Sequence, residues 1–243
     1  MPAIDDGGPL GQSWLMMREH HLPVGRTARF YTLGDPQRAP SEVWFVLHGY
    51  GQLAARFLRH FEVLDDGRRL IVAPEALSRF YFDTVAASHM HSPVGASWMT
   101  REDRLSEIDD YIEYLDALAD QIRRDIGGKL PRVVTLGFSQ GVATACRWVT
   151  KGQIVTDRLI IWGGLIPHDL DLAALAPPAS APGTEIVIVV GTEDGLVTSA
   201  AIAEQAERMS RESIVARTMT FAGGHRLDEE TLAALAASPA AVL

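Results

Sequence analysis

Short apolar runs recur along the chain and are separated by longer amphipathic stretches. Near-continuous runs of this kind are typical of parallel strands whose two faces are both covered. They occupy residues 43–47, 70–73, 132–136, 159–162 and 186–190. Alternating polar and apolar residues predict a further strand at 27–33, and residues 213–221 form a weaker candidate.

Helical patterns lie between these runs. The strongest covers residues 103–126, where Leu105, Ile108, Ile112 and Leu115 begin a series with spacings of three and four. The other predicted helices are residues 52–64, 141–149, 199–210 and 228–237. Alternation of strands and helices predicts an α/β fold: a mostly parallel, doubly wound sheet with helices on both faces. We expect residues 1–243 to form one domain.

Two stretches show no clear period. Residues 173–183 are rich in Pro and Ala and are predicted to be a surface connector. Residues 76–98 are long for a structureless loop, and such loops are often functional. This stretch follows a predicted strand and is rich in apolar side chains, so we interpret it as a lid over a ligand site.

A serine follows the apolar run at residues 132–136. Gly137-Phe138-Ser139-Gln140-Gly141 matches the pattern G-x-S-x-G and precedes a predicted helix. A strand, a tight turn and a helix are the context of a nucleophile elbow, in which small neighbours leave room for the turn. The sequence therefore predicts Ser139 as a nucleophile, against the alternative of a glycine-rich turn with a capping serine.

A serine hydroxyl needs a base, and the base needs an orienting acid. In this elbow context the acid and then the histidine follow the serine in the chain. Only His168 and His225 follow Ser139, and His225 lies just beyond a predicted strand, so we favour His225. Asp194, after the run at 186–190, is the preferred acid and Glu193 the alternative.

The oxyanion formed in acyl transfer needs two backbone N–H donors. One should be Gln140, the residue after the nucleophile. The other should lie in the loop after residues 43–47, where Tyr50 is the preferred donor and Gly51 the next. His48 precedes the nucleophile in the chain, so we interpret it as a residue that braces this loop.

Four motifs together carry a family resemblance: His48-Gly49-Tyr50-Gly51, Gly137-Phe138-Ser139-Gln140-Gly141, Gly191-Thr192-Glu193-Asp194 and Gly223-Gly224-His225. Their order and spacing resemble the acyl-protein thioesterase and carboxylesterase branch of the α/β-hydrolases, from residue 43 to the C-terminus. The resemblance implies a triad of Ser139, Asp194 and His225 with Tyr50 and Gln140 as oxyanion donors. One departure is Gln52, which stands where the eukaryotic thioesterases usually carry an acidic residue; it favours a generic carboxylesterase.

The expected function is hydrolysis of a carboxylic ester, or of a thioester, of a small acyl substrate through an acyl-enzyme. A peptidase or amidase, and a binding module that keeps the fold without catalysis, are the alternatives. In residues 76–98 we expect substrate contacts from Phe80, Tyr81, Phe82 and Trp98.

Composition narrows the remaining possibilities. With 31 acidic and 22 basic residues, the formal net charge is −9, which argues against binding to nucleic acid. One cysteine, Cys146, permits no internal disulfide and is expected to be a packed thiol. We expect no cofactor and no metal, although His89 and His91 are spaced as in some metal sites. The chain shows no signal sequence and no apolar run long enough to span a membrane, which favours a cytoplasmic protein of unknown oligomeric state.

Overall fold

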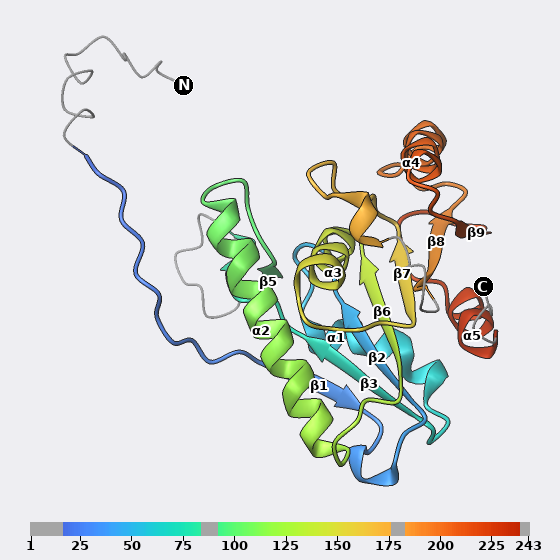
Figure 1. The fold of residues 1–243 in the computed structure, drawn as a ribbon, viewed down its shortest axis with the longest axis horizontal. Helices are drawn as coiled ribbons and strands as arrows, with labels where there is room; N and C mark the ends of the chain where they lie inside the picture. Colours follow the sequence, from blue (N-terminus) through green and yellow to red (C-terminus); the bar gives the residue numbers. More distant parts are fainter. Residues whose placement is uncertain (1–16, 84–91, 176–182, 239–243) are drawn as a thin grey trace.

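The computed structural model describes residues 17–83, 92–175 and 183–238. Its centre is a seven-stranded sheet in the order β1-β3-β2-β6-β7-β8-β9 (Figure 1). Within this sheet, the pairing of β1 with β3 is antiparallel and the other five pairings are parallel, so the predicted mostly parallel α/β sheet is confirmed. The strands are β1 (Phe30–Leu33), β2 (Glu42–Leu47), β3 (Arg69–Pro74), β6 (Arg132–Phe138), β7 (Arg158–Trp162), β8 (Glu185–Gly191) and β9 (Ala216–Phe221).

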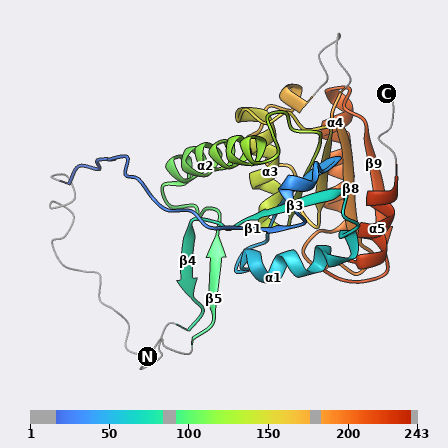
Figure 2. The same cartoon turned by 90° about the horizontal axis from the view of Figure 1, so that it is seen from below.

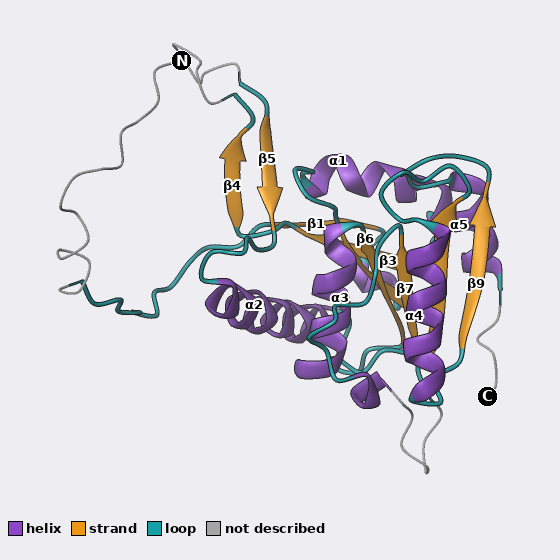
Figure 3. Ribbon diagram, turned by 90° about the horizontal axis from the view of Figure 1, so that it is seen from above, coloured by secondary structure: helices purple, strands orange, loops and turns teal. Residues whose placement is uncertain are grey.

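Helices cover both faces of this sheet (Figure 3). Side chains of α2, α3 and α4 join one buried cluster, and those of α1 and α5 join the other. Successive strand residues point to opposite faces, so Phe45 belongs to the first cluster and Trp44 to the second. The helices are α1 (Ala54–Leu58), α2 (Arg104–Asp125), α3 (Gln140–Lys151), α4 (Ser199–Arg211) and α5 (Glu229–Ala237), with 3₁₀ turns η3 (Pro36–Arg38), η4 (Arg59–Leu64) and η6 (Leu172–Leu175).

The described parts of residues 76–98 contain more regular structure than the sequence indicates. They contain two strands, β4 (Ser78–Tyr81) and β5 (Val94–Ser97), which pair as an antiparallel hairpin outside the main sheet. This hairpin extends away from the body of the domain (Figure 2). Each strand has only four residues, which is too short for alternation to stand out. Residues 84–91 of the expected lid, with His89 and His91, lie outside the described residues.

Three expected elements differ in extent. The predicted helix at 52–64 is the short α1 followed by the 3₁₀ turn η4. The strands expected at 27–33 and 213–221 are shorter, since they begin at Phe30 and Ala216. None of the described helices is long and apolar enough to cross a membrane.

Parallel pairing brings the carboxyl ends of several strands to one edge of the sheet. Leu47 at the end of β2 pairs in register with Gly137 near the end of β6. On the other side, Gly191 at the end of β8 pairs with Phe221 at the end of β9. The loops that carry the predicted site residues therefore start from the same edge, where open α/β sheets bind their ligands.

Candidate active site

Ser139 occupies a sharp turn between β6 and α3. Its backbone has φ 53° and ψ −118°, a region that residues other than glycine rarely adopt, and such strain is concentrated at functional sites. The turn is also crowded: a Cβ at Gly137 would lie 2.3 Å from the carbonyl oxygen of Gly141. A Cβ at Gly141 would lie 2.2 Å from the carbonyl oxygen of Leu47. The two glycines of the motif are thus required by close approach of the backbone.

Asp194 and His225 meet in the loops after the neighbouring strands β8 and β9. The distance from His225 Nδ1 to Asp194 Oδ2 is 2.8 Å, a hydrogen bond of normal length. The other oxygen of Asp194, Oδ1, accepts hydrogen bonds from the backbone N–H groups of Leu196 and Val197, at 2.8 and 3.1 Å. The alternatives Glu193 and His168 are both exposed. The structure therefore pairs the preferred acid with the preferred histidine.

The Asp194 carboxylate is held in its ionised form. Its side chain is only 1% exposed, and burial by itself would raise the pKa. The hydrogen bonds from His225, Leu196 and Val197 outweigh burial and lower the pKa of Asp194 below its ordinary value. A carboxylate at Nδ1 fixes the tautomer of the imidazole, leaving Nε2 as the nitrogen available to take a proton.

The His225 ring lies beside the serine turn. It packs on the ring of Phe138, the residue before Ser139, with 5.0 Å between the ring centroids. Gly163, directly after β7, lies close to the ring as well: a Cβ there would lie 3.2 Å from His225 Cε1 and 3.5 Å from Asp194 Oδ2. Among the described residues no hydrogen bond joins Ser139 Oγ to His225. Catalytic hydrogen bonds of this kind are often long before substrate binds.

Among the described residues, the backbone N–H groups of Tyr50 and Gln140 near Ser139 have no acceptor. Both residues are the predicted oxyanion donors. Gly51, the alternative donor, gives its N–H to the carbonyl oxygen of Ala96 at 2.8 Å and is therefore already used. Gln140 also stands at the start of α3, where the helix dipole favours negative charge.

The loop that carries Tyr50 is braced from behind. The buried His48 ring contacts the carbonyl oxygen of Gly49 through Nδ1 at 2.8 Å and accepts the N–H of Ala76 on Nε2 at 3.1 Å. Burial lowers the pKa of His48, which keeps the ring neutral and able to accept that bond. The bracing role expected for His48 is confirmed. Gln52 adds a second brace, since its Oε1 accepts the N–H of Gly49 at 2.8 Å.

The four expected substrate contacts divide into two kinds. Phe80, Tyr81 and Phe82 lie on or just after β4, and the last two are 48% and 50% exposed. Trp98 is only 2% exposed and donates its indole N–H to the carbonyl oxygen of His48 at 2.8 Å. The expected contact of Trp98 with substrate is therefore corrected to a bracing role behind the loop that carries Tyr50.

Reasoning from the sequence missed two features of the candidate site, Gly163 and the side chain of Gln140. Gly163 borders the histidine, and its signal was the glycine pair directly after an apolar strand. The side chain of Gln140 reaches Met99, with its Nε2 donating to that carbonyl oxygen at 2.8 Å. No local sequence signal marks this contact, because it joins residues far apart in the chain.

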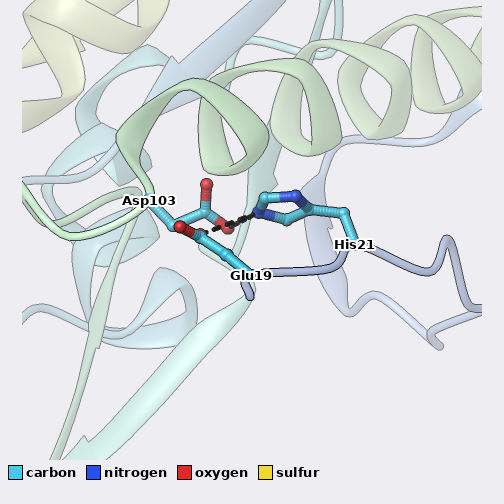
Figure 4. Close-up of side chains that lie close together, drawn as sticks. All are labelled: Glu19, His21 and Asp103. Atoms are coloured by element: carbon cyan, nitrogen blue, oxygen red, sulfur yellow. Dashed lines mark ion pairs between the residues drawn. The ribbon is translucent and has the colours of Figure 1, made fainter. Parts of the chain in front are cut away.

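A separate group of side chains lies on the surface near the start of α2. His21 Nε2 is 3.2 Å from a carboxylate oxygen of Glu19 and 3.2 Å from one of Asp103 (Figure 4). All three residues are exposed. One ring nitrogen faces both carboxylates, which is the geometry of an exposed ion-pair cluster, and we assign it no role in the chemistry.

Comparison with protein families identifies the family of this chain. The model described as serine hydrolase (FSH1) matches residues 44–231. The chain belongs to this family. The match begins in β2 and ends in α5, so it includes all four loops that carry the predicted site residues.

Solved structures support the same fold. Esterase PE8 is 22% identical over 86% of this chain and 98% of its own, with a TM-score of 0.64. Carboxylesterase from Mesorhizobium loti is 15% identical over 87% of this chain and 95% of its own (TM-score 0.65). Acyl-protein thioesterase 2 from Zea mays is 15% identical over 86% of this chain and 96% of its own (TM-score 0.61). No curated protein sequence matches this chain.

These findings confirm the α/β-hydrolase fold and the resemblance to its carboxylesterase and thioesterase structures. At such low identity the structural matches establish the fold alone. The roles of individual residues therefore depend on the geometry of this chain.

Proposed function

We propose that the protein is a serine carboxylesterase that hydrolyses carboxylic esters of small acyl groups, with thioesters of the same groups as alternative substrates, through an acyl-enzyme on Ser139. The observation that carries the proposal is the 2.8 Å bond between Asp194 and His225 beside the strained turn of Ser139. Acyl transfer of this kind needs a serine nucleophile, a histidine that takes its proton and a carboxylate that orients the histidine. Ser139, His225 and Asp194 supply these three groups. The family match supports a hydrolase that uses serine.

In the first half-reaction, Ser139 Oγ attacks the acyl carbon while its proton moves to His225 Nε2. The resulting oxyanion would accept hydrogen bonds from the N–H groups of Tyr50 and Gln140. Asp194 stabilises the imidazolium that has formed. The imidazolium then gives its proton to the leaving alcohol or thiol, and the bond between acyl carbon and leaving group breaks.

In the second half-reaction, water attacks the acyl-enzyme and gives a proton to His225. The new oxyanion would accept hydrogen bonds from the same two N–H groups, those of Tyr50 and Gln140. Collapse of this intermediate returns the proton from His225 to Ser139 Oγ and releases the carboxylic acid. Apart from the attacking water, both half-reactions use the same five residues: Ser139, Asp194, His225, Tyr50 and Gln140.

The acyl group would lie beside the aromatic side chains of the hairpin and the ring of Tyr50. Tyr50 is 60% exposed and Phe82 is 50% exposed, although both are large and apolar in part. Exposed rings that neighbour an active site favour recognition of an apolar substrate. We propose that Phe82 and Tyr81 contact the acyl chain, as the sequence interpretation expects.

A substrate panel tests the reaction class. It consists of p-nitrophenyl esters of increasing chain length, acyl-CoA thioesters and peptide anilides, each assayed with wild-type protein and Ser139→Ala. We expect turnover of the esters that is lost in Ser139→Ala. Turnover of the anilides alone would identify an amidase or peptidase, and binding of acyl compounds without any turnover would identify a binding module.

A further inference from the structure

We propose that the β4–β5 hairpin positions the oxyanion hole, and that Phe80 is its principal positioning residue. The proposal rests on the proposed function, since it concerns the donors Tyr50 and Gln140. These donors come from the loops after β2 and β6, whereas the hairpin comes from a different part of the chain. Four sets of contacts connect the hairpin to both donors.

The first contact is between aromatic rings. The Phe80 ring stacks on the Tyr50 ring, with 5.2 Å between centroids and 26° between planes. Phe80 is itself held by Phe82, whose ring meets it edge-on at 5.2 Å. Such pairs contribute beyond the area that they bury. Tyr50 is 60% exposed, and this stack is a contact from the hairpin that restrains its side chain.

The second contact fixes the backbone next to Tyr50. The N–H of Gly51 donates to the carbonyl oxygen of Ala96 in β5 at 2.8 Å. The fit is close, because a Cβ at Gly95 would lie 2.6 Å from the carbonyl oxygen of Gly51. The peptide after Tyr50 is thus fastened to the second strand of the hairpin.

The third contact involves Phe82. A Cβ at Gly51, which has φ +74°, would lie 2.7 Å from Phe82 Cζ. The ring therefore rests directly on the glycine. Together with the stack on Phe80, this contact places two aromatic rings against the loop that carries Tyr50.

The fourth contact reaches the second donor. The Gln140 side chain accepts the N–H of Trp98 on Oε1 at 3.1 Å and donates from Nε2 to the carbonyl oxygen of Met99 at 2.8 Å. Both partners directly follow β5 in the chain. One segment, residues 94–99, therefore bonds to Gly51, the neighbour of the first donor, and to the side chain of the second donor, Gln140.

This arrangement has a consequence for catalysis. Oxyanion donors act through preorganisation, so a small displacement lowers kcat more than it weakens binding of the uncharged substrate. A residue that only lines the acyl pocket has a different effect, since its loss raises KM or changes the preferred chain length. The two roles can be separated by kinetics.

The experiment compares Phe80→Ala, Phe80→Tyr and the control Phe30→Ala in the full chain. Phe30 lies on the edge strand β1 and is 37% exposed, so its loss removes the same side chain away from the hairpin. With a p-nitrophenyl ester we expect Phe80→Ala to lower kcat by about tenfold to a hundredfold, the usual cost of misplacing a catalytic group. We expect KM to change by less than about threefold, because the ground state is bound as before.

A trifluoromethyl ketone with the same acyl chain provides a second kinetic readout, because its adduct with serine mimics the oxyanion. Its inhibition constant should rise in Phe80→Ala in parallel with the loss of kcat. Phe80→Tyr keeps the ring and should restore both values, and Phe30→Ala should resemble wild type. The double variant Tyr50→Ala/Phe80→Ala should be no slower than the worse single variant, since the two rings act as a pair.

Hydrogen exchange tests the same proposal without any turnover. The peptide that contains the Gly51 amide should exchange faster in Phe80→Ala than in wild type, and at the wild-type rate in Phe30→Ala. Unchanged exchange, or a rise in KM at constant kcat, would overturn the proposal. If wild type hydrolysed no ester, the proposed function would fail, and the exchange result would still decide whether the hairpin holds this loop.

Discussion

Asp194 and His225 are joined by a 2.8 Å hydrogen bond although they come from the loops of two different strands. Those strands, β8 and β9, are parallel neighbours in the sheet. Asp194 is buried and accepts two further backbone N–H bonds, which prevent its side chain from rotating. The pair is therefore a fixed feature of the fold that presents one imidazole face toward the serine turn.

This relationship predicts an asymmetry between two adjacent acids. Asp194→Asn keeps the shape but removes the acceptor that selects the tautomer, so kcat should fall by about three to four orders of magnitude. Glu193→Gln should leave kcat within about twofold, because Glu193 is exposed and outside the pair. Steady-state kinetics on one ester measure both. A larger loss in Glu193→Gln would reassign the acid.

The lowered pKa of Asp194 predicts how stability depends on pH. A carboxyl with a lower pKa in the folded state stabilises the fold above its unfolded pKa, and this contribution is lost as pH falls through the folded pKa. The stability difference between wild type and Asp194→Asn should thus be largest above about pH 5 and shrink below about pH 4. Urea unfolding of both proteins at several pH values measures this difference in the free energy of unfolding. A difference that does not change with pH would contradict this account of the carboxylate.

Gly163 offers a test of the space around the histidine. Its φ is +58°, and an added Cβ would meet His225 Cε1 at 3.2 Å. Gly163→Ala should cost about 1–2 kcal/mol of stability through the backbone conformation. It should also lower kcat about tenfold to a hundredfold by shifting the ring.

The matched control for this prediction is Gly195→Ala. Nothing lies within 4 Å of a Cβ at Gly195, although that residue directly follows Asp194. We therefore expect near-wild-type kinetics and stability from Gly195→Ala. Equal losses in both variants would show that the space beside His225 is not what limits activity.

Cys146 should be unreactive in the folded protein. Its side chain is fully buried on α3, and burial raises the pKa of the thiol to about 12. Thiolates react, not thiols, so iodoacetamide at about pH 8 should label no cysteine and leave activity intact. Unfolding in guanidinium should expose one thiol. Labelling of the native protein with loss of activity would show that Cys146 is accessible and connected to the site.

Much of the site could be predicted because its parts are local. Ser139 directly follows β6, and Asp194 and His225 stand in the loops just after β8 and β9, so the parallel sheet brings them to one edge. His48 was interpreted as a brace on chain order alone, and its two hydrogen bonds agree. The mostly parallel sheet followed from apolar runs that are buried on both faces.

The features that could not be predicted depend on contacts between residues far apart in the chain. Trp98 was expected at the substrate, but its indole bonds to His48, 50 residues earlier in the chain. The hairpin could not be predicted because its strands are short and one contains Gly95. Gln140 was chosen for its backbone N–H, and nothing in the local sequence shows that its side chain reaches Met99.

The central claim is that Ser139 is the nucleophile, and labelling by a fluorophosphonate measures it most directly. The probe phosphonylates an activated serine, with loss of fluoride and of the hydroxyl proton. Intact-mass and peptide analysis should show one adduct in wild type, on the peptide that contains Ser139. Ser139→Ala should fold normally and carry no adduct. Labelling that persists in Ser139→Ala, or an adduct on another residue, would contradict the account.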